Sequence, residues 1–507
     1  MPAHLWKIAT GAGAAALAAV TAYDLTQRRH SILRSYPVLG HMRYLLEEVR
    51  PELQQYFIER NWDGRPFDRD TRTVIYERAK GIHGEQAFGT ERDVEEPGYE
   101  WLVQTIAPVP APAAPPRVVV GGPDCRRPYS MSLLNVSAMS FGALSANAIR
   151  ALNRGAAAGG FAHDTGEGGL SEHHRENGGD LIWELGTGYF GARTETGEFD
   201  PERFARRAAD PQVKCVSLKL SQGAKPGIGG VLPAPKVTAE IARVRGVPVG
   251  EKCVSPPAHS AFSAPAGLIR FVARLRELSG GKPVGIKLCV GSRVEVLSLC
   301  KAMRAVGTAP DFIIVDGSEG GTGAAPLEFE DTVGMPLTEG LMLVDSALRG
   351  AGLREAVKVG AAGKVAVGSD IVKRLIQGAD FTLSARAMMM AVGCIQAQKC
   401  HTDRCPVGVA TQDPRRARSL DVADKSERVQ RYQRSTVAEA VRLMASMGVS
   451  DPARLTPEML RRNTGPHRSS SYGELYGRLA PGQLLTDPPA DWAHDWARAS
   501  AEGFPQP

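Results

Sequence analysis

The chain has 507 residues, more than the about 250–300 that one core usually holds, so we expect a large domain with additional segments. Hydrophobic residues make up 43% and charged residues 23%, which is typical of a globular protein. The formal net charge of +6 is dispersed without a long block of one sign, which argues against nucleic acid as a partner. The eight cysteines fit a reducing compartment better than a disulfide framework.

The N-terminal segment 1–30 is predicted to anchor the chain in a membrane. Residues Leu5–Tyr23 are apolar or small apart from Lys7, and three arginines follow within residues 28–34. This length just spans a bilayer, although the many alanines make the segment only marginally hydrophobic. The basic residues after it place the bulk of the chain on the cytoplasmic face, through a single N-terminal pass. A cleaved signal peptide ending near Val20–Ala22 is the alternative.

A helical region and a stiff connector are predicted next, over residues 31–115. Apolar residues recur at three- and four-residue steps between Ser31 and Lys80, with Pro51 interrupting, which predicts two amphipathic helices packed on the main domain. The run Ile106–Pro116, IAPVPAPAAPP, cannot hold a helix and predicts an extended connector. We place the domain boundary there.

An alternation of short apolar runs with helix-like segments decides the predicted fold of residues 116–420. The runs are Leu134–Met139, Phe161–Asp164, Val213–Leu220, Cys253–Pro256, Val284–Val290, Phe312–Asp316, Val357–Gly360 and Phe381–Ala385. The helical segments include Ala146–Ala158, Ala266–Leu278, Arg293–Ala305 and Ser369–Gln377. Eight such units predict an α/β TIM (β/α)8 barrel, because a doubly wound sheet should show fewer strands. Long inserts near His173–Arg207 and Gly223–Gly250 are predicted active-site loops, and residues 421–507 a C-terminal region with a helix at Asp424–Met447 and a polar tail.

Three cysteines stand close together between Gly393 and Gln412. Cys394, Cys400 and Cys405 have a C-x5-C-x4-C spacing closed by a proline. Thiolates select clustered iron, zinc or Cu(I), and a proline directly after the last ligand also occurs in ferredoxin-type runs. With three cysteines, a 3Fe-4S cluster is the natural prediction. A structural zinc with His401 as fourth ligand, or three unrelated buried cysteines, are the alternatives.

This segment and six ordered motifs before it resemble the synthase barrel of the glutamate synthase large subunit. The motifs are SAMSFGALS, TGEGG, KLSQGAKPGIGG, SPPAHSAFS, DGSEGGTGAAP and GAAGKVAVG, and together with the cysteine run they cover about residues 118–412. The resemblance implies an FMN-binding barrel that holds a 3Fe-4S cluster beside the flavin. It also favours the anchor over a signal peptide, because such a protein is better placed in the cytoplasm.

The flavin site is predicted at the carboxyl ends of the strands, where TIM barrels place their active sites and often a phosphate after strands seven and eight. Glycine-rich backbone and fixed positive charge at those two loops suit a phosphate. The resemblance adds the loop after the sixth strand, beside the flavin phosphate, and the first strand end, along the flavin ring. The predicted cofactor residues are Ser137, Met139, Ser140, Asp316, Gly317, Glu319, Gly320, Gly321, Thr322, Gly323, Gly363, Lys364, Ala385 and Arg386.

The predicted catalytic residues are Glu167, Lys219, Gln222, Lys225 and Lys287. Lysines that flank a glutamine near a strand end suit the two carboxylates of 2-oxoglutarate, since ammonium groups donate to carboxylate oxygens. Glu167 would exchange a proton with ammonia or the imine. Lys287 would stabilise negative charge on a reduced flavin. A structural salt bridge, or for Lys287 a surface lysine, is the alternative.

The predicted function is therefore that of a glutamate synthase-like oxidoreductase. The resemblance implies electron delivery through the cluster to FMN, formation of 2-iminoglutarate from 2-oxoglutarate and ammonia, and hydride transfer to the imine. Met1-Pro2-Ala3 offers no glutaminase nucleophile, so ammonia is expected as the nitrogen source, with a separate glutaminase as a candidate partner. No nucleotide-binding module for NADPH is recognisable in the sequence, so a separate electron donor is expected. The alternatives are a related flavin reaction, such as N-methylglutamate synthesis, and a non-catalytic membrane-anchored electron-transfer subunit.

Overall fold

The computed structural model describes residues 3–82 and 84–505 and divides the chain into two compact units, Met1–Asp70 and Thr71–Pro507. The division comes before the Pro-rich segment 106–116, which lies within the second unit.

The first unit is helical. Its elements are α1 (Ala3–Thr26), α2 (Ser31–Ser35), α3 (Gly40–Leu53) and a π-helical turn η1 (Gln54–Ile58). Pro51 lies inside the last turn of α3 and does not end the helix, which passes directly into η1.

The predicted membrane anchor is wrong. In the described part of the chain, no helix combines the length and the apolar character needed to cross a membrane. Helix α1 has 24 residues, but alanine, glycine and threonine supply much of it, and these side chains offer little apolar surface to lipid. Residues 1–2 of the predicted segment 1–30 lie outside the described residues.

The second unit is built on a closed parallel barrel, as predicted. Its strands, in spatial order, are β4 (Leu134–Val136), β5 (His163–Asp164), β6 (Leu181–Leu185), β7 (Val213–Lys219), β10 (Val284–Leu288), β11 (Phe312–Asp316), β12 (Lys358–Ala362) and β13 (Phe381–Ser384). Pairing of β13 with β4 closes the ring, with Thr382 opposite Leu134. Each βα connection therefore opens at the same end of the barrel.

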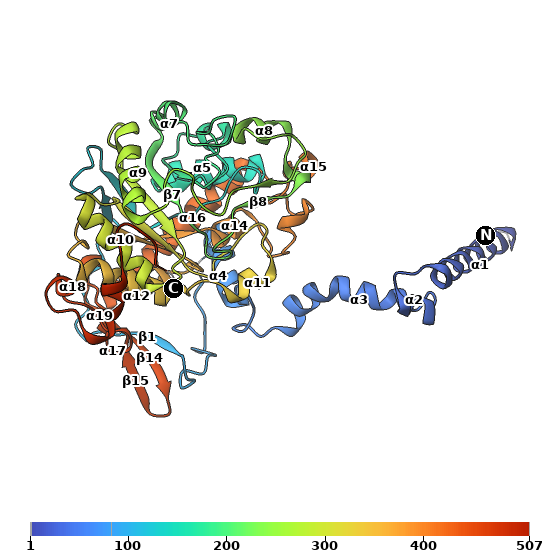
Figure 1. The fold of residues 1–507 in the computed structure, drawn as a ribbon. Coiled ribbons are helices and arrows are strands. Elements are labelled where there is room, and N and C mark those ends of the chain that lie inside the picture. The colour runs from blue at the N-terminus through green and yellow to red at the C-terminus, as the bar shows by residue number, and fades with distance from the viewer. Residues whose placement is uncertain (1–2, 83, 506–507) are drawn as a thin grey trace. The chain divides into compact units, whose positions relative to one another are not determined.

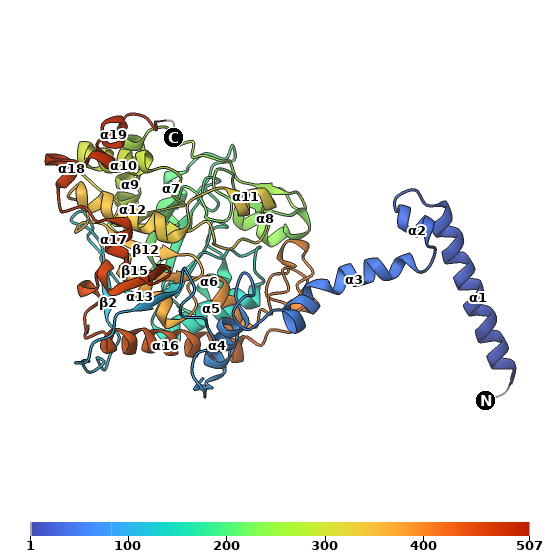
Figure 2. The same ribbon diagram turned by 90° about the horizontal axis from the view of Figure 1, so that it is seen from below.

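Helices surround the barrel, and the views of Figures 1 and 2 show them on its outside. They are α5 (Ala146–Gly159), α6 (Glu172–Arg175), α7 (Pro201–Ala208), α8 (Ala239–Arg245), α9 (Pro265–Leu278), α10 (Arg293–Val306), α11 (Leu327–Thr332), α12 (Leu337–Gly350), α13 (Gly368–Ile376) and α14 (Arg386–Val392). Ser145 caps α5 by accepting a hydrogen bond from the Ala148 N–H, and Gly160 ends it in the left-handed conformation.

The third barrel strand differs from the prediction. The run Cys253–Pro256 is not a barrel strand: its residues Cys253–Val254 form β9, which pairs with β8 (Val231–Leu232) in a separate two-stranded sheet. The third barrel strand is instead β6, which lies inside the segment predicted as a long loop. Glu184 interrupts the apolar run of β6, so the sequence pattern does not predict a strand there.

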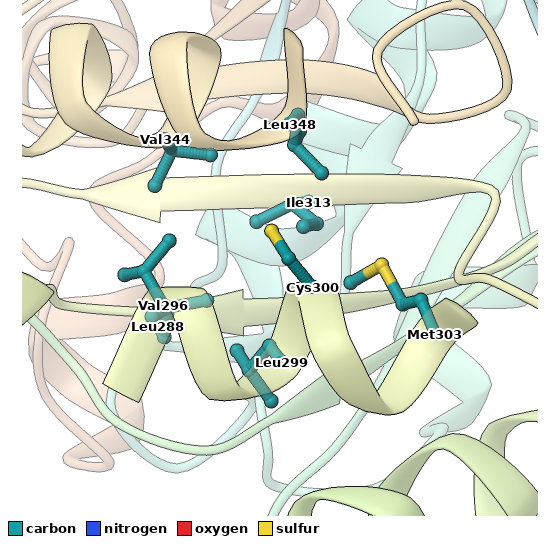
Figure 3. A pocket seen from close by; sticks show the side chains of 8 residues that line it. All are labelled: Leu288, Val296, Leu299, Cys300, Met303, Ile313, Val344 and Leu348. Carbon is teal, nitrogen blue, oxygen red and sulfur yellow. The ribbon is translucent and has the colours of Figure 1, made fainter. Parts of the chain in front are cut away.

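The layer between barrel and helices is apolar and tightly packed. Figure 3 shows side chains of β10 and β11 facing those of α10 and α12 around a cavity of about 10 Å³. The cavity is lined by Leu288, Val296, Leu299, Cys300, Met303, Ile313, Val344 and Leu348. A void of this size and lining is a packing defect and too small for a ligand.

The remaining elements extend the barrel unit. They are α4 (Arg69–Lys80, from Thr71 onward), β1 (Glu100–Leu102), the hairpin β2 (Arg117–Val120) and β3 (Tyr129–Ser132), α15 (Pro414–Ala417), α16 (Val422–Ser446), β14 (Leu460–Gly465), β15 (Arg468–Ser471), α17 (Tyr472–Tyr476), α18 (Gln483–Thr486) and α19 (Ala490–Arg498). The predicted helix at Asp424–Met447 is confirmed as α16, which packs along α5 (Figure 2). The predicted polar tail is ordered: β14 and β15 form a three-stranded sheet with β1.

Candidate functional site

Five buried or nearly buried charges of alternating sign cross the carboxyl end of the barrel. Glu167 follows β5, and its Oε2 lies 3.0 Å from the Nζ of Lys219 at the end of β7. Lys219 lies 3.7 Å from Glu184 of β6, and Glu184 lies 3.0 Å from Lys287 of β10. Lys287 lies 3.9 Å from Asp316 at the end of β11. Five consecutive strands of the barrel, β5, β6, β7, β10 and β11, thus position a continuous line of ion pairs where TIM barrels carry out their chemistry.

The ion pairs keep Lys287 charged despite its burial. Burial alone disfavours the ammonium form, but the carboxylates of Glu184 and Asp316 outweigh it and raise the pKa of Lys287 above its usual value. Lys287 is only 4% exposed, so it is not a surface lysine. The line therefore supplies a fixed positive charge inside the barrel.

Asp164 of β5 lies beside this line, and its pKa is raised. Burial and the charge of Glu184 raise the pKa of Asp164 to about 8. Its Oδ1 accepts a hydrogen bond from the Gly166 N–H at 3.0 Å. Its neutral form is therefore favoured more strongly than in an exposed aspartate.

Glu167 is an ionised carboxylate in a tight enclosure. Burial raises its pKa, but the charges of Lys219 and Arg245 outweigh this effect, and the pKa lies below its usual value. A Cβ built on Gly186 would lie 2.6 Å from Glu167 Oε2, and one built on Gly230 would overlap Oε1. The two glycines leave room for this carboxylate and for no further side-chain atom.

The predicted substrate residues Gln222 and Lys225 are engaged with the loop that follows β11. Gln222 Nε2 donates to the carbonyl oxygen of Gly321 at 3.0 Å, and Lys225 Nζ donates to that of Ala324 at 2.7 Å. Burial lowers the pKa of Lys225 to about 8. The sequence motif thus holds the loop in place, and only Lys219 of this motif pairs directly with Glu167.

The three loops predicted to hold the flavin phosphate meet at one place. The Gly317 N–H donates to the carbonyl oxygen of Ala362 at the end of β12, at 2.9 Å. Arg386, directly after β13, donates from Nη2 to the carbonyl oxygen of Glu319 at 2.6 Å. Lys364 adopts a left-handed backbone with φ of 49°. The predicted residues at these loop positions are Asp316, Gly317, Glu319, Gly320, Gly321, Thr322, Gly323, Gly363, Lys364, Ala385 and Arg386.

The loop after β4, predicted to line the flavin ring, contacts the loop that carries Glu167. The Ser137 N–H donates to the Ser384 carbonyl oxygen at 2.9 Å. A Cβ on Gly166 would lie 2.7 Å from the Ser140 nitrogen and 3.1 Å from that of Met139, so glycine permits this close approach. Buried Arg245 donates from Nη2 to Ser140 Oγ at 3.2 Å.

The cysteine segment forms an irregular loop, in which Gln396 and Cys405 are buried and most other residues are half-buried or exposed. Gln396, Gln398 and Asp403 all have positive φ, between 54° and 62°, which is costly for residues other than glycine. Burial, and then the neighbouring thiols of Cys400 and Cys405, raise the pKa of Cys394 to about 12. Within residues 3–82 and 84–505, however, no three His, Cys, Asp or Glu side chains form a metal-holding group. The thiols of Cys400 and Cys405 thus affect the pKa of Cys394, but the three thiols do not form a ligand set.

Sequence reasoning missed three of the charged groups at this site. Glu184 lay in the unrecognised strand β6, and Asp164 was assigned to a strand without a role. Arg245 ends α8, far along the chain from the other groups. A lone glutamate within the apolar run Leu-Ile-Trp-Glu-Leu was the one signal that could have indicated a charge inside a barrel.

Known proteins resemble this chain in sequence and in fold. Residues 124–450 match the family model described as the conserved region in glutamate synthase. The glutamate synthase large subunit-like protein YerD of Bacillus subtilis is 39% identical over 477 residues, which cover 86% of this chain and 90% of that protein. The archaeal glutamate synthase [NADPH] of Archaeoglobus fulgidus is 36% identical over 316 residues, covering 62% of this chain and 58% of its own length. A solved structure, mandelate oxidase with benzoyl-formic acid, has a TM-score of 0.42 at 13% identity over 73% of this chain and 86% of that chain.

Proposed function

Because this chain belongs to the glutamate synthase family, we propose that it is a glutamate synthase-like oxidoreductase that forms glutamate from 2-oxoglutarate and ammonia. The observation that carries the proposal is the line of charges from Glu167 to Asp316 at the carboxyl end of the barrel. Reductive amination needs cations that bind two carboxylates and a group that moves protons at the amine nitrogen and the carbonyl oxygen. Both kinds of group are present.

The cations near Glu167 suit a dicarboxylate. Lys219 lies 3.0 Å from Glu167, and the charges of Lys225 and Arg245 also act on that carboxylate. A dianionic substrate would share the two lysines as donors, since ammonium groups bind carboxylate oxygens by charge-assisted hydrogen bonds. Glu167, ionised at neutral pH, would accept a proton from the incoming ammonium.

FMN is the proposed cofactor, and the chain's residues fit it. The glycine-rich loop 316–323 meets the ends of β12 and β13, where Lys364 and Arg386 add positive charge suited to a phosphate. The chemistry that FMN supplies when bound is hydride transfer to the substrate. Lys287 would hold a positive charge beside the reduced ring. Its ion pair with Glu184 fixes the position of that charge.

The 3Fe-4S cluster is a further part of the proposal and has a test of its own. Three buried or half-buried thiols in one strained loop are the donor type that iron-sulfur clusters use, although they do not converge as a ligand set in this structure. We expect Cys400→Ser to abolish protein-bound iron and sulfide while FMN stays bound. The matched control is Cys300→Ser, a buried cysteine between α10 and the barrel. Unchanged iron content in Cys400→Ser, or zinc in its place, would contradict the cluster.

The activity is tested by supplying an artificial reductant, 2-oxoglutarate and 15N-labelled ammonium. We expect labelled glutamate from ammonium and none from amide-labelled glutamine unless a glutaminase partner is added. A parallel reaction with methylamine distinguishes N-methylglutamate synthesis. Absence of glutamate from flavin-loaded protein with both substrates would overturn the proposal. In the cell, a separate electron donor would supply the reductant.

A further inference from the structure

A second charged region lies outside the line of charges described above. A pocket of about 410 Å³ opens between α7, α8 and the segment after β6, and Figure 1 shows α7 and α8 at the same edge of the barrel unit. Six arginines line it: Arg193, Arg203, Arg206, Arg207, Arg243 and Arg245. Its volume is that of a small-molecule site.

Most of this positive charge is not neutralised by the protein. Arg203 pairs with Asp200 at 3.2 Å, and Arg206 lies 3.7 Å from Glu202 with both side chains exposed. The other four arginines have no carboxylate within ion-pair distance among the residues that the structure describes. Four guanidinium groups in one pocket without a close carboxylate partner favour a ligand with several negative charges.

The guanidinium groups are held in position before any ligand arrives. Arg193 and Arg245 lie over the ring of buried Phe190, with their Cζ atoms 5.6 and 5.2 Å from its centroid. Arg245 is 4% exposed, and its Nε is buried without a hydrogen-bond partner in the described structure. Arg203 donates from Nη1 to the Arg193 carbonyl oxygen at 2.8 Å. Such preorganisation lowers the entropy cost of binding.

We propose that this pocket binds a small molecule with two or three linked phosphate groups. Two N–H groups of one guanidinium can donate to two oxygens of one phosphate. Linked phosphates also carry more negative charge than a dicarboxylate such as 2-oxoglutarate. The charges continue from the exposed Arg243 at the mouth to the buried Arg245 at the floor, so the ligand enters a concave site. The ligand class covers inorganic pyrophosphate and nucleoside diphosphates.

The pocket is connected to the loop that carries Glu167. Arg207 donates from Nη1 to the Leu170 carbonyl oxygen at 3.2 Å, and Arg245 donates to Ser140 Oγ and to the Phe141 carbonyl oxygen. A phosphate that attracts these two guanidinium groups competes with their present acceptors. Binding of the phosphate ligand is therefore coupled to the segment 166–170, and the pocket would act as an effector site.

The test is calorimetric titration of the full chain with pyrophosphate and, in a second arm, with ADP. Arg193→Gln and Arg243→Gln should each weaken pyrophosphate binding about tenfold, the loss of one charge-assisted contact. The control is Arg154→Gln, an exposed arginine on α5 outside the pocket, which should bind as the wild type does. Arg243 is exposed, so its replacement leaves the fold intact and its result can be read directly. Tighter binding of ADP than of pyrophosphate would indicate a nucleotide.

Two results overturn the inference. The first is that neither probe binds saturably at millimolar concentration and low salt. The second is that the two pocket variants and the control bind pyrophosphate with equal affinity. Hydrogen exchange with and without pyrophosphate tests the connection: we expect a change at amides 166–170, and unchanged exchange there refutes the coupling. None of these measurements depends on the glutamate-forming activity, so either proposal can fail without the other.

Discussion

Replacing Glu184 by glutamine tests the physical basis of the site. This side chain is 1% exposed and lies between two lysines, 3.0 Å from Lys287 and 3.7 Å from Lys219. Glutamine keeps the shape and removes the charge. The variant therefore leaves both ammonium groups buried with one carboxylate fewer.

The magnitude follows from the distances. With an effective dielectric constant of about 20, Coulomb's law gives roughly 5 kcal/mol for the pair with Lys287. Asp316, 3.9 Å from Lys287, still offsets part of that loss. Breaking one partner of a buried pair costs about 3–5 kcal/mol in measured cases, and we expect Glu184→Gln to fall in this range.

Urea denaturation of wild type and variant at one pH measures this change in the free energy of unfolding. Glu176→Gln is the matched control, since Glu176 pairs with Arg150 at 2.6 Å but with both side chains about a third exposed. That surface pair should contribute about 0–1 kcal/mol. The double replacement Glu184→Gln with Lys287→Met should recover part of the loss, because it removes a buried ammonium group that has lost its nearest carboxylate. A Glu184→Gln variant no less stable than Glu176→Gln would refute the electrostatic account.

Three further outcomes follow. Gly230→Ala should displace the Glu167 carboxylate and reduce glutamate formation far more than Gly503→Ala, whose new methyl group meets open space; equal rates would contradict the enclosure. For Lys225, whose pKa is lowered to about 8, deprotonation above that pH should raise the KM for 2-oxoglutarate, and Lys225→Arg should keep KM constant from pH 7 to 9. A flat profile in the wild type would show that this lysine does not bind substrate. Arg386→Ala should weaken FMN binding about tenfold or more in fluorescence titration, by loss of a charged partner, and unchanged affinity would remove Arg386 from the phosphate site.

Much of the barrel could be predicted from the alternation of apolar runs and helical segments. Seven of the eight predicted runs each overlap one barrel strand, since strands buried on both faces read as continuous apolar stretches. The rule failed where function places a charge inside the barrel, because Glu184 interrupts β6. It also failed at Cys253, whose apolar neighbours belong to a two-stranded sheet in a loop region.

The site could be predicted as a set of motifs but not as a set of contacts. The TGEGG motif predicts Glu167, and positions near strand ends predict Lys219 and Lys287; the structure joins the three in one line through Glu184. Gln222 was expected to bind substrate, yet its side chain holds a loop. Whether such a side chain faces the substrate or a loop depends on a residue that is distant in sequence. The local pattern of charges does not reveal that residue.

The most direct test of the central claim is anaerobic reoxidation of the reduced, flavin-loaded protein, followed by its visible absorbance. With 2-oxoglutarate and ammonium together, we predict rapid return of the oxidised flavin spectrum and one glutamate formed per flavin; with either substrate alone, the spectrum should stay reduced. A reduced spectrum that persists with both substrates, in protein that retains its flavin, would contradict the account.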